Sequence, residues 1–360
     1  MALQYSIGQL FKTMKSQTAS DLHLNVSSPP RLRIDGQIVP LDLPALSSSD
    51  CQELCYAVMT EQQKKELEEN REVDFSFNVK NIARFRANIY FHNATVSGAF
   101  RIITDRIYSI EELGLPPVLE DICKLPNGLV LVTGPTGSGK STTLASMIDY
   151  INSKAFGHIL TIEDPIEFVH PHKNSIVSQR EVGSDTMSFS RALKSALRQD
   201  PDVVLLGEMR DLETIHAAIT IAETGHLVFA TLHTNSCISS INRMIDVFPA
   251  HQQSQIRVQL SMTMKAVLSQ ILLPARGGGR VMAMEIMRVT PPIRALISEG
   301  KISQIYSSMQ VGQTETKMQT MNQCLLDLVN KNYISRELAV EKSPAPEELA
   351  EMLLNKVRKR

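Results

Sequence analysis

The sequence predicts an α/β protein: a central domain built on a mostly parallel sheet, preceded by a smaller α+β domain and followed by a helical region. Three patterns support this prediction. Residues 119–287 alternate short, nearly continuous apolar runs with helical stretches, as in a parallel sheet that is buried on both faces. Residues 1–105 instead alternate apolar and polar side chains, as in an antiparallel sheet, and residues 288–360 carry helix-start signals.

The composition excludes several classes of protein. A chain of 360 residues suggests two or three domains, and 43% hydrophobic with 21% charged residues is ordinary for a globular protein. The 37 basic and 38 acidic residues nearly cancel, so no overall positive field attracts nucleic acid and no nucleic-acid partner is expected. The longest apolar run, residues 54–59, is far shorter than the ~20 residues of a membrane-spanning helix, so we expect a soluble protein.

The N-terminus and the cysteines favour a cytoplasmic location. Lys12 and Lys15 follow the first apolar residues instead of preceding them, which is not the charge order of a secretory signal. The 5 cysteines are odd in number, irregularly spaced and without a Cys-x-x-Cys pair. They therefore fit reduced thiols and give little support to a structural zinc site.

Residues 1–105 are expected to form the small α+β domain. An amphipathic segment with apolar residues at helical spacing, from Ile7 to Met14, comes first. Asp35-Gly36 supplies the positive φ angles of a tight hairpin turn between two short apolar runs. The expected strands are residues 21–26, 32–34, 38–39, 73–79, 85–91 and 99–103.

Residues 106–118 are expected to link this domain to the central one, residues 119–287. Four runs rich in leucine or β-branched residues predict buried parallel strands in the central domain, at residues 129–133, 159–162, 203–206 and 227–231. In the helical region, residues 288–360, we expect helices that begin at Pro291 and Pro346 and a third over residues 318–331.

The strongest chemical signal is the segment from Gly134 to Ser141, which matches the phosphate-loop pattern G-x-x-x-x-G-K-[ST] between a predicted strand and a predicted helix. Backbone amides, unobstructed by side chains at the glycines, can wrap a phosphate at the positive end of the helix. Lys140 is expected to neutralise the β- and γ-phosphate oxygens, and the Ser141 hydroxyl to ligate Mg²⁺. The predicted nucleotide-binding residues are Gly134, Pro135, Thr136, Gly137, Ser138, Gly139, Lys140, Ser141 and Thr142.

A second element that serves hydrolysis is expected at the end of a neighbouring parallel strand. The strand predicted at residues 203–206 is followed by Gly207 and Glu208, so glycine stands where many phosphate-loop enzymes carry an aspartate associated with Mg²⁺. Glu208 is then the candidate general base on the attacking water, and a structural ion pair with Arg210 is the alternative. Gly207 also leaves open a scaffold that binds nucleotide without hydrolysing it.

An acidic cluster of Glu163, Asp164 and Glu167 follows the strand predicted at residues 159–162. Carboxylates at such a place can hold the water shell of a magnesium ion. Glu163 is therefore the candidate for positioning metal or water, and helix capping is the alternative.

Two histidines, His226 and His233, flank the strand predicted at residues 227–231. A histidine beside the γ-phosphate can sense that group by hydrogen bonding. A buried ring that is satisfied by the backbone is the alternative.

Six segments together resemble one family, the secretion ATPases: Asp21 to Leu24, the phosphate loop, Thr161 to Glu167, Gly207 to Asp211, Glu223 to Leu227 and Thr231 to Thr234. Within that family the chain is most similar to the PilT-like motors that retract bacterial type IV pili. The likeness covers essentially the whole chain, and the combination of motifs is far more specific than a phosphate loop alone. It implies a PAS-like N-terminal domain, a RecA-like core, ATP and Mg²⁺ as cofactors, and a hexameric ring.

The resemblance also implies roles for single residues. The family's catalytic glutamate, acidic-box residue and histidine-box residues fall on Glu208, Glu163, His226 and His233. The family places arginines of the N-terminal sheet near the nucleotide, and Arg86 and Arg101 match them best, with exposed sheet charge as the alternative. The family's retraction motif matches residues 292–300, but Ala295 and Ser298 replace its usual Asn and Arg.

The function implied by the resemblance is a hexameric ATP-hydrolysing motor that powers pilus retraction and twitching motility. The motor is expected in the cytoplasm, peripheral at the inner membrane, with a platform protein of that membrane as its partner and a paralogous retraction ATPase as a candidate second partner. The nucleotide is expected between the N-terminal domain and the core. Three alternatives stay open: an accessory retraction ATPase, a pilus-extension or type II secretion ATPase, and a RecA-like nucleic-acid translocase.

Overall fold

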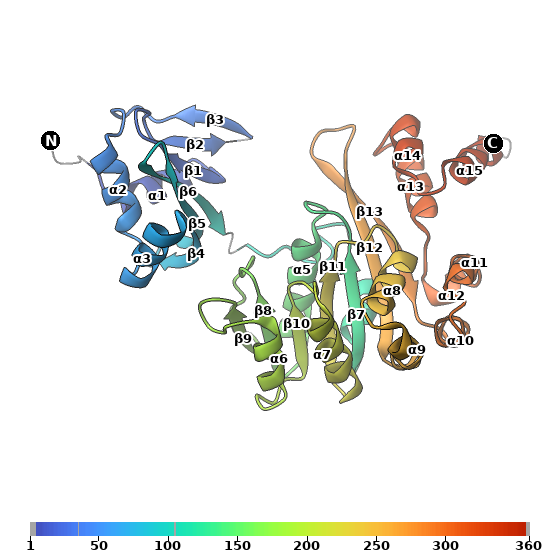
Figure 1. The fold of residues 1–360 in the computed structure, drawn as a ribbon. Coiled ribbons are helices and arrows are strands. Elements are labelled where there is room, and N and C mark those ends of the chain that lie inside the picture. Colours follow the sequence, from blue (N-terminus) through green and yellow to red (C-terminus); the bar gives the residue numbers. More distant parts are fainter. Residues whose placement is uncertain (1–4, 35, 104–105, 358–360) are drawn as a thin grey trace. The chain divides into compact units, whose positions relative to one another are not determined.

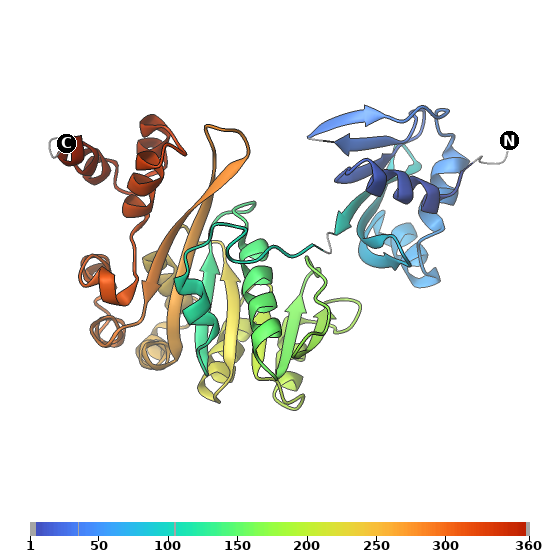
Figure 2. The ribbon, with the colours of Figure 1, turned by 180° about the vertical axis from the view of Figure 1, so that it is seen from behind.

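The structure of the protein, a computed structural model, describes residues 5–34, 36–103 and 106–357. These residues divide into two compact units, which Figures 1 and 2 show as ribbons. The first unit takes the chain up to Arg106 together with Glu167–Val169, and the second takes Ile107–Ile166 and the chain from His170 onward. Each unit has a hydrophobic core of its own, as expected of bodies that pack independently.

The first unit consists of a six-stranded antiparallel sheet and three helices, with the strand order β3-β2-β1-β6-β5-β4. Its strands are β1 (Asp21–Leu24), β2 (Arg31–Ile34), β3 (Gln37–Pro40), β4 (Glu72–Val79), β5 (Ala83–His92) and β6 (Thr95–Ile103). Its helices are α1 (Ile7–Ser16), α2 (Ser48–Tyr56) and α3 (Glu61–Asn70). Each helix begins with a capping box, which satisfies amide groups that the first turn leaves unpaired.

One face of this sheet carries the core of the first unit. Phe11 of α1 stacks on Phe85 of β5 with 4.2 Å between the ring centroids, and Phe100 of β6 meets Phe11 edge-on. Along β5, Phe85 and Ala87 are buried while Arg86 between them is exposed. The predicted antiparallel strands with one solvated face are therefore confirmed.

The second unit is built on a seven-stranded sheet with the order β13-β12-β7-β11-β10-β8-β9. All neighbouring strands are parallel except β12 and β13, which form an antiparallel pair. The strands are β7 (Gly128–Thr133), β8 (His158–Glu163), β9 (Ile176–Glu181), β10 (Val203–Leu206), β11 (Leu227–Leu232), β12 (Met264–Pro274) and β13 (Arg280–Arg288). The predicted α/β core with a mostly parallel sheet is confirmed.

Helices cover both faces of this sheet, as the opposite views of Figures 1 and 2 show. Leu129 and Leu131 of β7 belong to a core shared with α6 to α9, whereas Val130 and Val132 belong to a second core shared with α4 and α5. Both sets of side chains are buried, which explains why residues 129–132 of the strand are all apolar. These helices are α4 (Val118–Cys123), α5 (Lys140–Lys154), α6 (Phe189–Ala196), α7 (Leu212–Glu223), α8 (Cys237–Asp246) and α9 (Ala250–Thr263).

The chain after β13 is helical and belongs to the same compact unit as the sheet. The first elements are α10 (Pro291–Ser298), the 3-10 helix η1 (Ile302–Gln304), α11 (Ile305–Met309) and α12 (Gln313–Thr316). They are followed by α13 (Met321–Asn330), α14 (Arg336–Lys342) and α15 (Pro346–Val357), which form a small core with β12 and β13. The predicted helix starts at Pro291 and Pro346 are confirmed.

Three strands have no counterpart in the sequence prediction: β9, β12 and β13. The edge strand β9 is largely polar, and β12 begins at Met264 directly after α9 ends, so no turn residue marks the change. In the predicted hairpin turn, Gly36 has a φ of +84°, while Asp35 lies outside the described residues. None of the described helices is both long enough and apolar enough to cross a membrane.

Candidate functional site

The candidate site lies at one edge of the seven-stranded sheet, where the parallel strands end. Strands β7, β8, β10 and β11 point the same way, so their carboxyl ends lie along one edge. Four of the predicted residues lie at or just after these ends: Gly134, Glu163, Glu208 and His233. Ligand sites of open α/β sheets occupy such an edge.

The phosphate loop connects β7 to α5 through glycines in backbone conformations that other residues rarely adopt. The φ angles are +143° at Gly134, +78° at Gly137 and +87° at Gly139. A Cβ atom at Gly134 would lie 2.2 Å from the carbonyl oxygen of Gln270, whereas one at Gly137 would meet nothing within 4 Å. No side chain caps the N-terminus of α5, so its first amides remain available for an anion.

Lys140 lies over this loop. Its ammonium donates hydrogen bonds to the carbonyl oxygens of Gly134 at 2.8 Å and Pro135 at 3.1 Å. Burial lowers the pKa of Lys140, and a bound anion would oppose that shift. The carboxylate of Glu208 partly opposes the shift as well, so Lys140 is held at the loop as a cation that faces the candidate base.

The loop fits a magnesium nucleotide. Ser141, in the first turn of α5, is exposed and can offer its hydroxyl to a metal. Among the described residues, no cluster of three histidine, cysteine or acidic side chains could hold a metal ion. Mg²⁺ usually binds through few protein ligands, phosphate oxygens and water, which suits a single hydroxyl beside a phosphate cradle.

Glu208 makes contacts through both carboxylate oxygens. Its Oε2 accepts a hydrogen bond from Arg210 Nη2 at 2.7 Å, and its Oε1 lies 3.3 Å from His233 Nε2. The hydrogen bond from Arg210 is the main reason that the pKa of Glu208 is lowered. The ion pair that the structural alternative predicts is therefore present, and its carboxylate also faces His233.

His233 connects this carboxylate to the phosphate loop. Its Nδ1 lies 3.4 Å from Oγ1 of Thr136, the third residue of the loop, while its Nε2 faces Glu208. The structure thus brings together three predicted site residues that lie far apart in the sequence. One ring therefore contacts both the loop and the candidate base.

Glu163 ends β8 as a buried carboxylate. Its Oε1 accepts hydrogen bonds from Thr161 Oγ1 at 2.7 Å and from Gln179 Nε2 at 3.3 Å. Residues 164–175 contain no helix, so capping of a helix that directly follows Glu163 is ruled out. The part of Glu163 in holding metal or water stays a prediction.

Gly207 is explained by the close approach of β10 to β8. Its amide donates to the carbonyl oxygen of Ile162 at 2.8 Å, and its own carbonyl accepts a hydrogen bond from Thr231. A Cβ atom at this position would lie 3.3 Å from Cα of Glu163 and 3.4 Å from that same Ile162 oxygen. An aspartate here would crowd the end of β8, which accounts for the departure from the usual pattern.

His226 lies away from the phosphate loop of its own chain. It directly precedes β11, whose first residue pairs with Gly128, whereas the loop follows the other end of β7. The length of such a strand is roughly 20 Å. The ring nitrogen Nδ1 lies 3.1 Å from the carbonyl oxygen of Ile221. The half-buried ring of His226 thus makes the backbone contact of the alternative, and its part beside a phosphate stays a prediction.

Arg86 and Arg101 face each other in register on β5 and β6 of the first unit. Arg101 Nε donates to Asp21 Oδ1 at 2.8 Å, and Arg86 Nη2 lies 3.9 Å from Asp74. The exposed fraction of the side chain is 68% for Arg101 and 43% for Arg86. They therefore match the exposed sheet charge of the alternative, and their approach to a nucleotide stays a prediction.

Gln270 is a site residue that the sequence prediction missed. It lies on β12 and is fully buried, and its Nε2 donates to the carbonyl oxygen of Ser138 in the phosphate loop at 2.7 Å. The signal that could have found it is a glutamine, next to Ser269, inside the otherwise apolar run of residues 266–273. Such a residue in a buried strand needs a hydrogen-bond partner.

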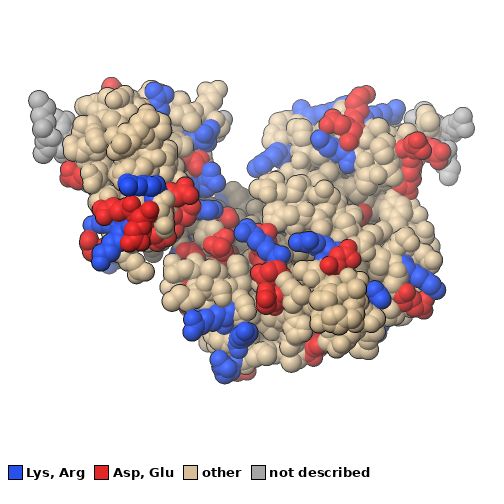
Figure 3. All heavy atoms as spheres, in the orientation of Figure 1, with Lys and Arg blue, Asp and Glu red and all other residues tan. Residues whose placement is uncertain are grey.

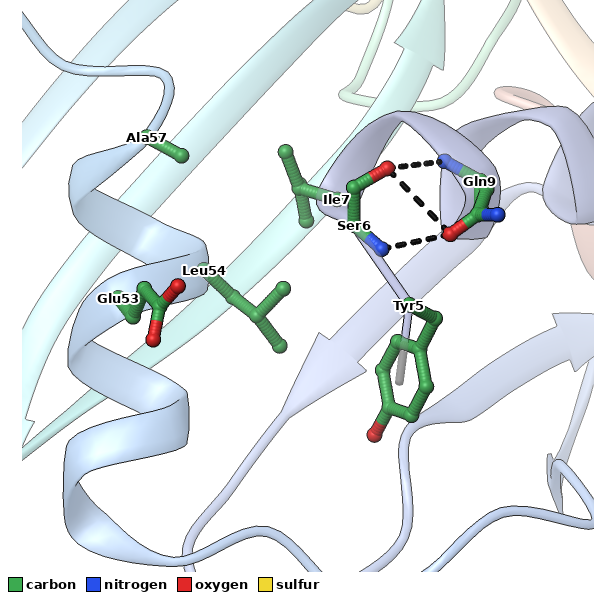
Figure 4. Close-up of a pocket in the computed structure, with 7 residues that line it drawn as sticks. All are labelled: Tyr5, Ser6, Ile7, Gln9, Glu53, Leu54 and Ala57. Atoms are coloured by element: carbon green, nitrogen blue, oxygen red, sulfur yellow. Dashed lines mark hydrogen bonds between the residues drawn. The ribbon is translucent and has the colours of Figure 1, made fainter. Parts of the chain in front are cut away.

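The pocket of Figure 4 is separate from these residues. It has a volume of about 340 Å³ and lies in the first unit, where Tyr5, Ile7 and Leu54 from the start of α1 and from α2 line it. Its wall combines apolar side chains with the capping contact between Ser6 and Gln9.

Comparison with known proteins identifies the family. Residues 3–277 match the family model described as "Type II/IV secretion system protein". The chain is 52% identical to the type IV pilus retraction ATPase PilT of Pseudomonas aeruginosa, over 95% of this chain and 99% of that protein. It is 39% identical to the type IV pilus ATPase PilU of the same organism, over 96% of this chain and 90% of that protein.

A solved structure agrees with these sequence matches. A crystal structure of the pilus retraction motor PilT with bound ADP superposes on this chain with a TM-score of 0.92 at 51% identity, covering 97% of this chain and 100% of that one. The phosphate loop, Glu208 and His233 thus lie in a fold that is similar to that of a nucleotide-bound motor. The chain belongs to the type II/IV secretion system protein family and, within it, to the PilT-like pilus retraction ATPases.

Proposed function

We propose that this protein hydrolyses ATP and uses the energy to retract type IV pili. One observation carries the proposal: a carboxylate, Glu208, lies at the same sheet edge as the phosphate loop, and His233 contacts both. The 52% identity to PilT along nearly the whole chain supports the same activity.

In this proposal each residue of the site has a separate role in hydrolysis. The loop amides and the α5 N-terminus bind phosphate oxygens, and Lys140 adds a full positive charge. Ser141 would hold Mg²⁺, which when bound neutralises charge on the phosphates. A glutamate is ionised at neutral pH, as a general base on water requires, and the lowered pKa of Glu208 extends this ionised state to lower pH. His233 fixes the direction of that carboxylate relative to the loop.

The assembly in which this chain works belongs to the same proposal. We infer a homohexameric ring of the 40.1 kDa chain that acts at the cytoplasmic side of the inner membrane on a platform protein of the pilus machine. Membership in the PilT-like family supports this assembly. The higher identity to PilT, 52% against 39% to PilU, favours the main retraction motor over an accessory one.

Phosphate release from the purified protein tests the enzymatic part. Lys140→Ala should abolish both nucleotide binding and turnover. Glu208→Gln should retain binding and lose turnover by roughly 10²- to 10⁴-fold, because an amide cannot take a proton from water. Glu213→Gln, an exposed glutamate in the first turn of α7, is the matched control and should keep full turnover. Retained turnover in Glu208→Gln would refute the assigned base.

A strain without the protein tests the physiological part. Loss of the retraction motor should leave cells hyperpiliated and immobile on surfaces, and Lys140→Ala supplied in trans should not restore motility. Cells without pili would instead indicate an extension ATPase. Turnover that rises when DNA is added would indicate a nucleic-acid translocase, so wild-type phosphate release is measured with and without DNA.

A further inference from the structure

We propose that Gln270 is a positioning residue that fixes the phosphate-binding conformation of the loop by holding the peptide group between Ser138 and Gly139. The inference rests on the proposed nucleotide binding and concerns a strand that no sequence motif marks. Its basis is a single buried residue of β12, whose backbone approaches the start of the loop and whose side chain bonds to the other end.

The sheet register places Gln270 beside the loop. Strand β12 lies parallel to β7, with Ser269 opposite Thr133, the last residue of β7. Gln270 therefore stands next to Gly134, where the loop leaves the sheet. A Cβ atom at Gly134 would lie 2.2 Å from the Gln270 carbonyl oxygen, which shows how closely the two backbones approach.

The side chain of Gln270 reaches the other end of the loop. Its Nε2 donates to the carbonyl oxygen of Ser138 at 2.7 Å, and a Cβ atom at Gly139 would lie 3.4 Å from the same nitrogen. Gln270 is fully buried, so this hydrogen bond is shielded from water. The reverse orientation of the amide would place Oε1 against the Ser138 oxygen, two acceptors in contact, so the amide nitrogen is the atom that faces the loop.

Because the peptide group is planar, the hydrogen bond to the Ser138 carbonyl also fixes the direction of the Gly139 N–H. In a trans peptide the C=O and N–H groups point in opposite directions. A hydrogen bond that holds the Ser138 carbonyl toward β12 therefore turns the Gly139 N–H away from β12. Gly139 is the N-cap of α5 and has a φ of +87°, where glycine reorients easily. Among the described residues, no hydrogen bond occupies the N–H of Gly137 or Gly139, so both remain available for phosphate.

The direct test is the affinity for Mg·ADP, measured by equilibrium binding on the full chain. Gln270→Met keeps the length of the side chain and removes the donor. Its affinity should fall about tenfold, the scale of one buried hydrogen bond, and the melting temperature of the nucleotide-free protein should fall by only a few degrees, because the same hydrogen bond is present without nucleotide. In turnover assays KM should rise with kcat nearly unchanged, because the loop binds the ground state and the transition state alike.

Gln319→Met is the matched control. Gln319 Nε2 also donates to a backbone carbonyl, that of Met284 at 2.8 Å, which lies opposite Gln270 on β13 and is not part of the loop, so the variant disturbs the same strand pair without removing the loop contact. This variant should bind Mg·ADP like the wild type. An affinity of Gln270→Met within twofold of the Gln319→Met value would overturn the inference. Failure of the wild type itself to bind Mg·ADP would instead overturn the proposed function.

A second variant, Gln270→Glu, tests the donor role of residue 270 if Gln270→Met does not fold. In Gln270→Glu a protonated carboxyl can donate to the Ser138 oxygen, whereas an ionised one cannot and also repels phosphate. Its Mg·ADP affinity relative to wild type should therefore decrease as the pH rises. A ratio that is constant with pH would contradict a donor role for residue 270.

Discussion

At the scale of single residues, the site depends on a carboxylate whose charge is set by two neighbours. Glu208 is partly exposed, and Arg210 and His233 each contact one of its oxygens. Arg210 is mostly exposed, so its effect on Glu208 is partly screened by solvent. The arrangement keeps the base ionised while one oxygen still faces the ring that touches the phosphate loop.

Removal of the Arg210 hydrogen bond should change the pH dependence of turnover. Arg210 lowers the pKa of Glu208, so Arg210→Gln should raise that pKa and protonate the base at a higher pH. The acid limb of kcat should then move to higher pH. The measurement is phosphate release at saturating ATP over roughly pH 5 to 9.

Arg198→Gln controls for the loss of one positive charge. Arg198 is exposed beyond α6 and is not a hydrogen-bond partner of Glu208, so its substitution should leave the acid limb in place. An unchanged acid limb in Arg210→Gln would show that Arg210 does not set the charge of the base.

At the scale of elements, the site depends on how closely the strand ends pack. The amide of Gly207 bonds to Ile162, and Thr231 of β11 bonds to the Gly207 carbonyl, so the end of β10 is held from both sides. Strand β12 supports the loop in the same way through Gln270. The outer half of β12, at Leu273, packs in the small core of the C-terminal helices. One strand therefore connects those helices to the phosphate loop.

A side chain at position 207 should destabilise the protein, although many phosphate-loop enzymes carry an aspartate at this position. In Gly207→Ala the new Cβ atom would lie 3.3 Å from Cα of Glu163, so either the end of β10 or that of β8 must shift. We expect a loss of about 1–3 kcal/mol in the free energy of unfolding, as for other overpacked sites, together with slower turnover. Denaturant unfolding and phosphate release measure the two effects.

Gly277→Ala is the matched control for this substitution. Its Cβ atom would meet nothing within 4 Å, and its φ is not positive, so stability and turnover should stay close to wild type. A Gly207→Ala protein as stable as Gly277→Ala would mean that close packing is not the reason for glycine at 207.

At the scale of the whole molecule, the chain consists of two units that each complete a sheet and a core. The six-stranded sheet uses only residues before the second unit begins. Acidic and basic side chains are intermixed on the face shown in Figure 3, for example over α3. This agrees with a net charge of -1 and with the absence of a large cationic field in the sequence.

The first unit should fold by itself. A fragment of residues 1–106 contains the whole six-stranded sheet and its aromatic core, and its length is within the range of independent small domains. Thermal unfolding followed by circular dichroism should show one cooperative transition. Phe11→Ala should lower the stability of the fragment by about 3–5 kcal/mol. Ile38→Ala, at a side chain that is 42% exposed, should change it little. A fragment without a cooperative transition would show that the unit depends on the rest of the chain.

Local patterns in the sequence were sufficient for the phosphate loop and for most of the sheet. The loop is one uninterrupted segment, Gly134 to Ser141, whose chemistry depends on residue types at fixed spacing. The strands buried on both faces contain continuous apolar runs, at residues 129–132 of β7 and 227–230 of β11. The sequence did not predict the edge strand β9, because it is largely polar, or the strand β12, because it follows a helix without a turn.

The sequence by itself determined the fold class, the phosphate loop and the carboxylate at the end of β10, since each is encoded by neighbouring residues along the chain. Only the tertiary structure decided that His233 joins Thr136 to Glu208, that His226 lies at the far end of β11, and that Gln270 holds the loop. The physical reason is that these contacts depend on the order and register of strands in the sheet. Periodicity within one strand reports burial but does not specify which strand lies beside it.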